Sequence, residues 1–495
     1  MKRHKDEATC IEIQDLFAPH KKDEEEPATV VLHGPAGIGK TFTVNKIMMD
    51  WASNNLFDGR FEYVFHLNCR DLNTCTDDVS LVDLILNSAE ELQPDIEKIL
   101  ARPEKLLFII DGFDELKFSL DQVNVGVARD WNTKHPVEIT LCRLLKKKIL
   151  SKSKLLITTR ATALENLGRI VDVERCVEIL GFSEGEIKEY VSKFYQNEQQ
   201  ASVVFNYIAE NEAVFSMCFV PVVCWIVCSV MKDHDEESLA KKLKTTTQIF
   251  AHFVNKLLRH HGASEDSQIL QKVGSLALQG VNKKQVLFEK QDLVELSLDP
   301  AQCRSTFFSE VIFKQELDKK SMYHFFHLSI QELFAAFFCV TSKDDKVVEN
   351  MLNESMTTES DHLVHVIRFL FGLSNVKTLK IIQDNFTEPS SALRTQLEKW
   401  IQQAVCSYKD KPRYFVELLN CFYETQDEEF VKCAMKNINT VNLRHCHLNK
   451  SACLAIRYCI EQSDQVDKLD AFGCCLRGEE IKVLLGVLPK CQSIL

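Results

Sequence analysis

The stretch that decides the fold is "LHGPAGIGKT", residues 32–41. It matches the pattern G-x-x-x-x-G-K-[ST], whose fixed positions are Gly34, Gly39, Lys40 and Thr41. The preceding "TVVLH" (29–33) is a β-branched run suited to a buried strand, and the following "FTVNKIMMDWA" (42–52) has helical apolar spacing. Strand, loop and helix in this order are the context that a phosphate-binding loop requires.

This loop is predicted to cradle the phosphates of a nucleotide. Its glycines let backbone N–H groups turn inward, and the helix amino terminus adds a positive dipole end. Lys40 would neutralise the β- and γ-phosphate charge, and Thr41 would reach Mg²⁺. The bare pattern also occurs by chance, so it needs support from the rest of the chain. The residues predicted to bind the nucleotide here are Gly34, Pro35, Ala36, Gly37, Ile38, Gly39, Lys40, Thr41 and Phe42.

A second element, "KLLFIIDGFDEL" (105–116), supplies that support. An apolar β-forming run ends at Asp111, as in a Walker B strand, so Asp111 joins Thr41 as a predicted Mg²⁺ ligand. Asp114 and Glu115 follow at once and could orient or deprotonate an attacking water. The alternative is that these acids only cap a surface turn.

A third strand is predicted in "SKLLITTR" (153–160), which ends in Arg160. An arginine at this place could sense the terminal phosphate, and we count it with Asp114 and Glu115 among the catalytic candidates. The alternative is a plain salt-bridged arginine on the surface.

Composition limits the class of protein. The 495 residues carry a formal net charge of −12, with no overall basic footprint for nucleic acid. The basic run Lys146–Lys148 is interpreted as a solvated helix face. The amino-terminal residues lack the apolar core of a signal peptide. The longest apolar run (217–231) is too short to span a bilayer, and it is predicted to be a buried helix. We therefore expect a cytoplasmic protein without a transmembrane segment.

The 19 cysteines are scattered and mostly lie in apolar contexts. In an intracellular chain, this pattern favours reduced thiols over a disulfide framework. Their spacing matches no zinc site, so no metal other than Mg²⁺ is predicted.

The loop, "DGFDEL", "LLITTR", "CFVPVVCWIVC" and "FFHLSIQELFAAFF" together resemble the NACHT module of the NLRP family of cytosolic receptors, from about residue 29 to the end. The resemblance implies ATP or ADP as the ligand. It also implies that Pro221 packs on the adenine, that Trp225 lines the same pocket, and that His327 reaches the β-phosphate of ADP. From the residue pattern alone, all three would be interpreted as core residues.

The chain departs from the family pattern in three places. Ala161 follows Arg160 where relatives usually have proline. Only about 28 residues precede the first strand, so we expect neither a pyrin domain nor most of the segment that usually covers the adenine. "VNLRHCHL" (441–448) and "LDAFGCCL" (469–476) repeat with an offset of 28 residues, which predicts leucine-rich repeats that stop early, as in a short isoform.

The predicted fold is an α/β P-loop NTPase domain with a parallel sheet, then a helical domain, a winged helix, a second helical domain and the start of a leucine-rich repeat solenoid. Ser183 and Glu186 form a capping box that marks the second domain. A short strand pair is expected around "KQVLFEKQDL" (284–293) of the winged helix. The predicted bounds are 1–28 (extension), 29–180, 181–239, 240–345, 346–435 and 436–495.

The phosphate loop and the acids after the second strand bear on three possible functions. The favoured one is a nucleotide-controlled switch, in which ADP holds a closed monomer and ATP frees an oligomerising face, with slow hydrolysis. A motor NTPase should show an in-trans arginine and a pore loop, and neither is identifiable. A passive scaffold would not need the loop lysine and both acids. No [NT]-K-x-D guanine-reading element occurs, which favours adenine. The resemblance to the family implies either immune signalling or a germline or early-embryo scaffold, and the motifs do not separate the two. Protein partners would bind through the helical and repeat surfaces.

Overall fold

The computed structural model describes residues 11–19, 25–34, 37–75, 77–120, 130–160, 163–232, 243–260, 267–298, 308–315, 318–325, 327–356, 361–384, 389, 391–474, 476 and 478–495. The chain divides into two compact units, Met1–Gly181 and Phe182–Leu495. Each unit is built around its own sheets and helices.

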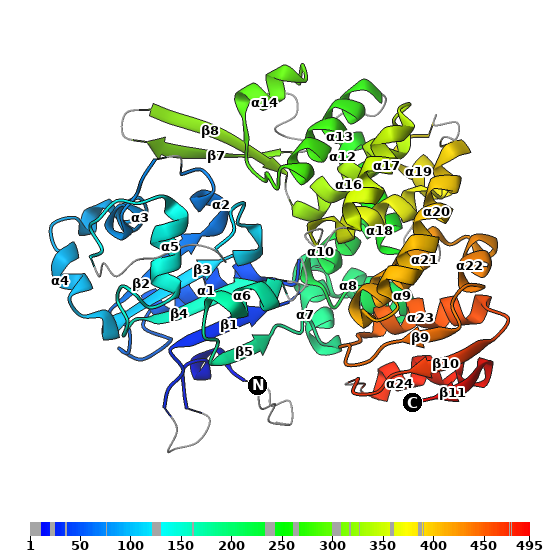
Figure 1. The fold of residues 1–495 in the computed structure, drawn as a ribbon, viewed down its shortest axis with the longest axis horizontal. Helices are drawn as coiled ribbons and strands as arrows, with labels where there is room; N and C mark the ends of the chain where they lie inside the picture. Colours follow the sequence, from blue (N-terminus) through cyan, green and yellow to red (C-terminus); the bar gives the residue numbers. More distant parts are fainter. Residues whose placement is uncertain are drawn as a thin grey trace. The chain divides into compact units, whose positions relative to one another are not determined.

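The first unit is an α/β domain with one parallel sheet, as predicted. The strand order is β2-β3-β4-β1-β5, and every neighbouring pair is parallel (Figure 1). The strands are β1 (Thr29–His33), β2 (Tyr63–Asn68), β3 (Leu106–Asp111), β4 (Lys154–Thr159) and β5 (Arg175–Glu178). The three strands expected from the sequence correspond to β1, β3 and β4. Because β4 lies between β1 and β3, the ends of these three strands meet at one edge of the sheet.

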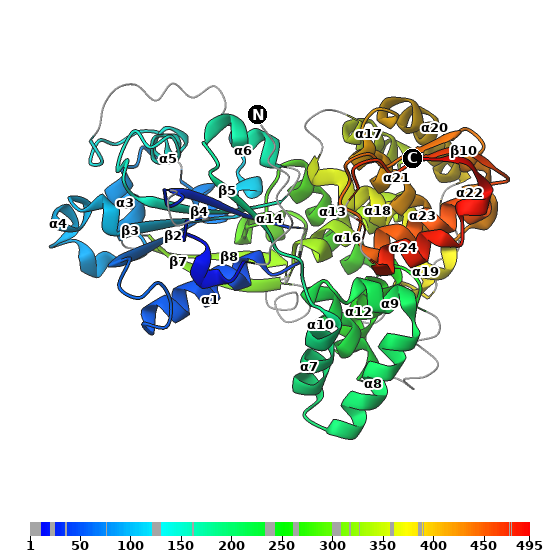
Figure 2. The same cartoon turned by 90° about the horizontal axis from the view of Figure 1, so that it is seen from below.

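Helices cover both faces of this sheet, as Figure 2 shows. Along β3, Leu107 and Ile109 pack on the α1 side, whereas Phe108 and Ile110 pack on the side of α3, α4 and α5. Burial on both faces explains why β3 is a continuous apolar run rather than an alternating one. The helices are α1 (Lys40–Ala52), α2 (Cys69–Leu72), α3 (Leu81–Leu86), α4 (Ile96–Leu100), α5 (Val137–Leu145) and α6 (Leu164–Ile170), with short 3₁₀ turns η1 (Ile13–Asp15), η2 (Glu90–Leu92), η3 (Pro103–Lys105) and η4 (Phe113–Glu115).

Part of the amino-terminal extension is packed onto this domain. Phe17 is fully buried against the rings of Phe57 and Phe61. The Arg175 guanidinium donates hydrogen bonds to the carbonyl oxygens of Asp15, Leu16 and Ala18 at 2.6–2.8 Å. The extension is therefore anchored at the amino end of β5, whereas the phosphate loop follows the carboxyl end of β1.

The second unit begins with the helix whose cap the sequence predicted. The Glu186 N–H donates to Ser183 Oγ, and the Ser183 N–H donates to Glu186 Oε2, so the capping box is confirmed. The apolar run 217–231 is not one helix, because α9 ends at Met217 and α10 starts at Pro221, where proline fits the first helical position. The first helices are α7 (Glu184–Tyr195), α8 (Glu198–Glu210), α9 (Glu212–Met217), α10 (Pro221–Met231) and α12 (Thr246–His260). None of the described helices is long and apolar enough to cross a membrane.

A winged helix follows, and its strands differ from the expected strand pair. Within 284–293 the structure has one short strand, β6 (Phe288–Glu289), which pairs with β8. The larger part of the wing is the antiparallel hairpin of β7 (Phe308–Gln315) and β8 (Asp318–Phe325), which the sequence analysis missed. The associated helices are α13 (Ser267–Asn282), α14 (Lys290–Glu295) and α16 (Leu328–Thr341).

The rest of the unit is helical and then returns to alternating strands and helices. The helices are α17 (Asp345–Ser355), α18 (Val364–Leu373), α19 (Val376–Ile382), α20 (Ser391–Tyr408), α21 (Pro412–Thr425) and α22 (Glu428–Met435), with the turn η6 (Asp361–Leu363). After them come β9 (Thr440–Asn442), α23 (Lys450–Gln462), β10 (Val466–Asp470), α24 (Gly478–Leu485), η7 (Leu488–Lys490) and β11 (Cys491–Ile494). Leu469 pairs in parallel with Val441, the same offset of 28 residues that the sequence shows.

Candidate nucleotide site

The phosphate-loop sequence leaves the carboxyl end of β1 through a tightly packed glycine. The Gly34 N–H donates to the Thr159 carbonyl of β4 at 3.3 Å, and a Cβ on Gly34 would lie 2.9 Å from Ile38 Cγ2. Gly39 has a φ of 103° and directly precedes α1, a backbone conformation that favours glycine. Both glycines are therefore required by the path of the loop. Pro35 and Ala36 lie outside the described residues.

Lys40, the first residue of α1, lies among the predicted catalytic acids. Its Nζ donates to the Gly34 carbonyl at 3.0 Å. Burial lowers the pKa of Lys40, and Arg160 adds to this effect, whereas Asp114, Glu115 and Asp111 oppose it. The loop lysine and the acids that follow β3 therefore share one electrostatic environment, as the predicted site requires.

Asp111 ends β3 as a buried, hydrogen-bonded carboxylate. Its Oδ1 accepts a hydrogen bond from Thr158 Oγ1 at 2.5 Å, and its Oδ2 lies 3.8 Å from His66 Nε2. Burial acts to raise the pKa of Asp111, but the polar side chains of His66, Thr158 and Thr41 outweigh it and hold this pKa below its ordinary value. Asp111 is thus ionised at neutral pH and lies beside the Thr41 hydroxyl.

A carboxylate next to a hydroxyl fits Mg²⁺, which takes oxygen ligands and retains several waters. In the part of the chain that the structure describes, no group of three or more His, Cys, Asp or Glu side chains could hold a metal ion. A Mg²⁺ held by Thr41 and Asp111 would therefore take its other ligands from water and phosphate.

The depressed pKa of Asp111 leads to a prediction about stability. A carboxyl whose pKa is lower in the folded than in the unfolded chain contributes stability above its unfolded pKa of about 3.9, and loses that contribution as the pH falls through the folded pKa. Asp111→Asn should lower the free energy of unfolding by roughly 1–3 kcal/mol at pH 7. In urea titrations the difference from the wild type should shrink below about pH 4. A difference that stays constant from pH 7 to about pH 3.5 would show that the Asp111 charge contributes no stability.

Asp114 and Arg160 bind each other. Arg160 Nε lies 3.0 Å from Asp114 Oδ2, and the Arg160 backbone N–H donates to Asp114 Oδ1 at 2.9 Å. The two side chains are only 14% and 11% exposed. Arg160 is salt-bridged, as the simpler interpretation held, but the pair is mostly covered and its charges act on Lys40.

Glu115 is held by an arginine that the sequence analysis missed. Arg70 of α2 binds both Glu115 carboxylate oxygens, with Nη2 donating to Oε1 at 2.9 Å and Nε to Oε2. Burial acts to lower the pKa of Arg70, but the hydrogen bond and charge of Glu115 raise it above its ordinary value. Asn73 Nδ2 also donates to the Glu115 carbonyl at 2.8 Å. Both predicted catalytic acids are thus oriented by arginines.

The sequence feature that could have identified Arg70 as a site residue is its position just after strand β2. Asn68, the last residue of β2, pairs in register with Asp111. Arg70 therefore follows β2 at the sheet edge where Glu115 follows β3. His66 and Thr158 reach the site in the same way, from strands that neighbour β3.

The other predicted ligands lie elsewhere on the chain. Phe42 is on the outer face of α1 and is 75% exposed. Pro221, Trp225 and His327 belong to the second unit. Trp225 is 39% exposed, and its ring contacts Phe253 edge-on at 5.1 Å. Their roles at a nucleotide remain predictions.

His327 is the N-cap of α16 rather than a core residue within a helix. Its Nδ1 accepts a hydrogen bond from the Ser329 backbone N–H at 3.1 Å. A neutral imidazole that accepts at Nδ1 carries its proton on Nε2. The capping bond therefore selects the tautomer whose Nε2–H can donate to a phosphate oxygen.

Models of three protein families match the chain in order. They describe the NACHT domain (residues 28–198), the NOD2 winged helix domain (268–325) and the NLRC4 helical domain HD2 (327–433). Among solved structures, a chain of the Drosophila ORC bound to DNA matches with a TM-score of 0.22 and 12% identity, covering 65% of this chain and 82% of that one. A likeness this low carries no inference.

Curated relatives extend the match over nearly the whole chain. NACHT, LRR and PYD domains-containing protein 12 of Homo sapiens is 37% identical over 480 residues, 94% of this chain and 45% of that protein. Protein 3 of the same series, also from Homo sapiens, is 36% identical over 486 residues, 93% of this chain and 46% of that protein. The chain spans less than half the length of these relatives. The three family models and the identity over nine-tenths of the chain confirm that it belongs to the NLRP family of NACHT proteins.

Proposed function

We propose that this chain is an ATP- and ADP-binding switch, in which ADP holds a closed monomer and ATP releases an oligomerising form. Nucleotide binding follows from its NACHT domain. The observation that carries the switch is the shared site of Lys40, Asp114 and Arg160, in which a mostly covered acid–arginine pair acts on the lysine that would bind phosphate.

The residues of this site suggest how the switch would respond to the terminal phosphate. Lys40 and Arg160 are cations, and a γ-phosphate would compete with Asp114 for Arg160. Once Arg160 binds the γ-phosphate instead of Asp114, the Asp114 carboxylate would be able to orient a water together with Glu115. Mg²⁺ held by Thr41 and Asp111 would supply charge neutralisation between phosphates. The presence of a γ-phosphate would thus rearrange ion pairs that join β3 to β4.

His327 is proposed as the residue through which ADP stabilises the closed form. The family resemblance assigns it to the β-phosphate, and its N-cap geometry provides the Nε2–H donor. One charge-assisted hydrogen bond of this kind contributes about 1.5–3 kcal/mol. A coupling of that size shifts a closed–open equilibrium roughly tenfold to a hundredfold.

Substitution of His327 tests this proposal. His327→Asn retains a capping acceptor for Ser329 but removes the imidazole, so it should weaken ADP roughly tenfold or more in titration calorimetry and weaken ATP less. His327→Ala should do the same and also lose the cap, lowering thermal stability with and without ADP. Unchanged ADP affinity in both variants, with only the alanine variant less stable, would reduce His327 to a helix cap.

The carboxyl-terminal strands and helices are proposed to begin a leucine-rich repeat solenoid. β9, β10 and β11 form a parallel sheet in sequence order, with α23 and α24 as the connections. One strand and one helix per 28 residues is typical of such repeats. The domain bounds given above also remain predictions.

Innate immune signalling in the cytoplasm is the role we propose for the switch. The support is similarity to the NACHT, LRR and PYD domains-containing proteins 3 and 12. A germline or early-embryo scaffold that binds partners without hydrolysis is the alternative. Such a scaffold would need neither a Glu115 carboxylate that Arg70 holds in place nor the Asp114–Arg160 ion pair.

A further inference from the structure

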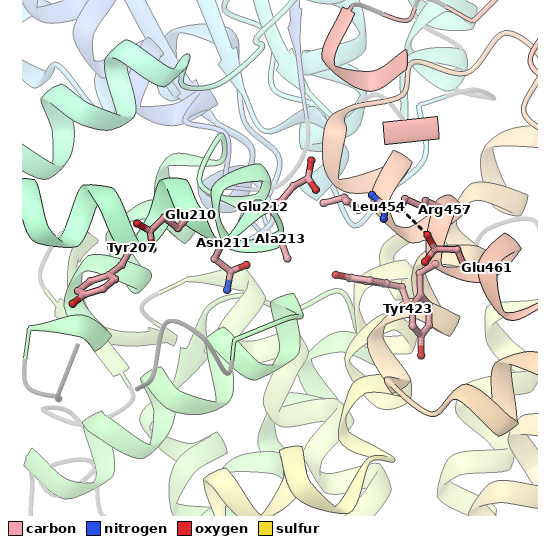
Figure 3. Close-up of a pocket in the computed structure, with 10 residues that line it drawn as sticks. Tyr207, Glu210, Asn211, Glu212, Ala213, Tyr423, Leu454, Arg457 and Glu461 are labelled. Atoms are coloured by element: carbon pink, nitrogen blue, oxygen red, sulfur yellow. Dashed lines mark hydrogen bonds and ion pairs between the residues drawn. The ribbon is translucent and has the colours of Figure 1, made fainter. Parts of the chain in front are cut away.

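A second site is indicated by a cavity in the second unit. The cavity has a volume of about 510 Å³ and lies between the junction of α8 with α9 and the helices α21 and α23 (Figure 3). This volume is within the range of small-molecule sites. None of the residues predicted to bind nucleotide lines it.

Two tyrosines form a fixed aromatic wall of this cavity. The rings of Tyr423 and Tyr458 meet edge to face, with centroids 5.4 Å apart and an angle of 83° between the planes. The Tyr423 hydroxyl donates to the Lys244 carbonyl at 3.0 Å. Asn211, also a lining residue, donates from Nδ2 to the Leu243 carbonyl at 2.9 Å. One hydrogen bond therefore fixes the Tyr423 ring, and the other fixes Asn211 at the junction of α8 and α9 on the opposite side of the cavity.

Acidic side chains outnumber basic ones around the cavity. Glu210, Glu212 and Glu461 line it, and Arg457 is the one basic residue of the lining. Arg457 Nε pairs with Glu461 at 2.8 Å, and Lys450 approaches Glu212 at 3.4 Å from outside. The lining thus carries three carboxylates and one guanidinium, and Glu210 lies beside Tyr207, at the end of the cavity away from Tyr423 (Figure 3).

The charges of the lining glutamates act on the pKa values of Arg457 and Tyr423 in the same direction. The hydrogen bond from Arg457 to Glu461 raises the arginine pKa, and the charge of Glu212 adds to it. Burial raises the pKa of Tyr423, and Glu212 is among the groups that raise it further. The cavity therefore favours positive and disfavours negative charge, and it already stabilises one guanidinium.

We propose that this cavity binds an organic cation, a guanidinium or alkylammonium group, over the rings of Tyr423 and Tyr458, on the side of the cavity where Glu212 and Glu461 lie (Figure 3). An aromatic face attracts a cation through its quadrupole, and the attraction grows when both are partly desolvated. Carboxylates beside the ring accept charge-assisted hydrogen bonds from the same group. The cation could be a free polyamine or a basic side chain of a protein partner, and both present the same chemistry.

Calorimetric titration of the full chain tests this proposal with defined probes. N-acetyl-arginine amide should bind saturably, and N-acetyl-citrulline amide, which has nearly the same shape but no charge, should bind roughly tenfold more weakly. The double substitution Glu210→Gln, Glu212→Gln should weaken the arginine probe by a similar factor. Glu198→Gln, on the same helix as Glu210 but outside the lining, is the matched control and should bind like the wild type. All three glutamates are exposed, so thermal unfolding should be unchanged.

Spermidine in the same experiment distinguishes the two sources of the cation. Tighter binding of spermidine than of the arginine probe would support a free polyamine, and the reverse would support a protein side chain. Equal binding of the arginine and citrulline probes would overturn the proposal. So would an arginine affinity unaffected by the double substitution, or no detectable binding of either cation to the wild type.

Discussion

Lys40→Ala should weaken the binding of both ADP and ATP roughly a hundredfold in titration calorimetry, because a charge-assisted hydrogen bond to phosphate contributes up to about 3 kcal/mol. Lys40 lies at the first position of α1, where it is partly buried and where the charges of Asp111, Asp114 and Glu115 act to raise its pKa. Removing its ammonium leaves three carboxylates facing the phosphates without the neutralising charge.

Lys46→Ala provides a matched control for Lys40→Ala. Lys46 is on the same helix, exposed, and paired with Asp50 at 2.8 Å. A surface pair of this kind contributes little, so nucleotide affinity and stability should stay close to those of the wild type. Wild-type affinity in the Lys40 variant would show that the assignment of the phosphate loop is wrong.

Glu115→Gln should slow ATP hydrolysis by at least about a hundredfold and trap the ATP-bound form as oligomers, because a positioned general base contributes about 10²–10⁴ in rate. Wild-type turnover should itself be slow, since a switch needs a long-lived bound state. The measurement is single-turnover hydrolysis, with nucleotide affinity determined in parallel. Hydrolysis unaffected by the substitution would exclude Glu115 as the base, and turnover of tens per second in the wild-type monomer would favour a motor.

Arg70→Ala is the companion variant, because Arg70 positions Glu115 through both carboxylate oxygens. It should lower the hydrolysis rate while leaving ATP affinity nearly unchanged, and Arg70→Lys should restore the rate in part, since lysine retains the charge but not the paired geometry. Equal losses of stability and affinity in both variants would indicate a purely structural role.

The local parts of the fold could be predicted from the sequence. "TVVLH" and "LLFIID" are short apolar runs of β-forming residues, which is typical of strands that are buried on both faces of a parallel sheet, and the structure shows this burial. Ser183 and Glu186 are three residues apart and satisfy each other's backbone, which fixed the start of α7. These signals act over a few residues and do not depend on strand order.

The ion pairs of the site depend on strand order and could not be predicted. Arg70 and Glu115 are 45 residues apart and meet only because β2 pairs with β3. Arg160 meets Asp114 because β4 lies beside β3. The pairing of the two-residue β6 with β8 likewise depends on tertiary contacts, whereas the hairpin of β7 and β8 is a local element that was missed.

Light scattering with ADP and with a non-hydrolysable ATP analogue tests the central claim most directly. The switch predicts a monomer with Mg²⁺ and ADP, and a larger, defined mass with Mg²⁺ and the analogue. Lys40→Ala should show no response at nucleotide concentrations that only just saturate the wild type, because its affinity should be roughly a hundredfold lower. The same mass for the wild type in both nucleotides, at concentrations that saturate the site, would contradict a nucleotide-controlled assembly.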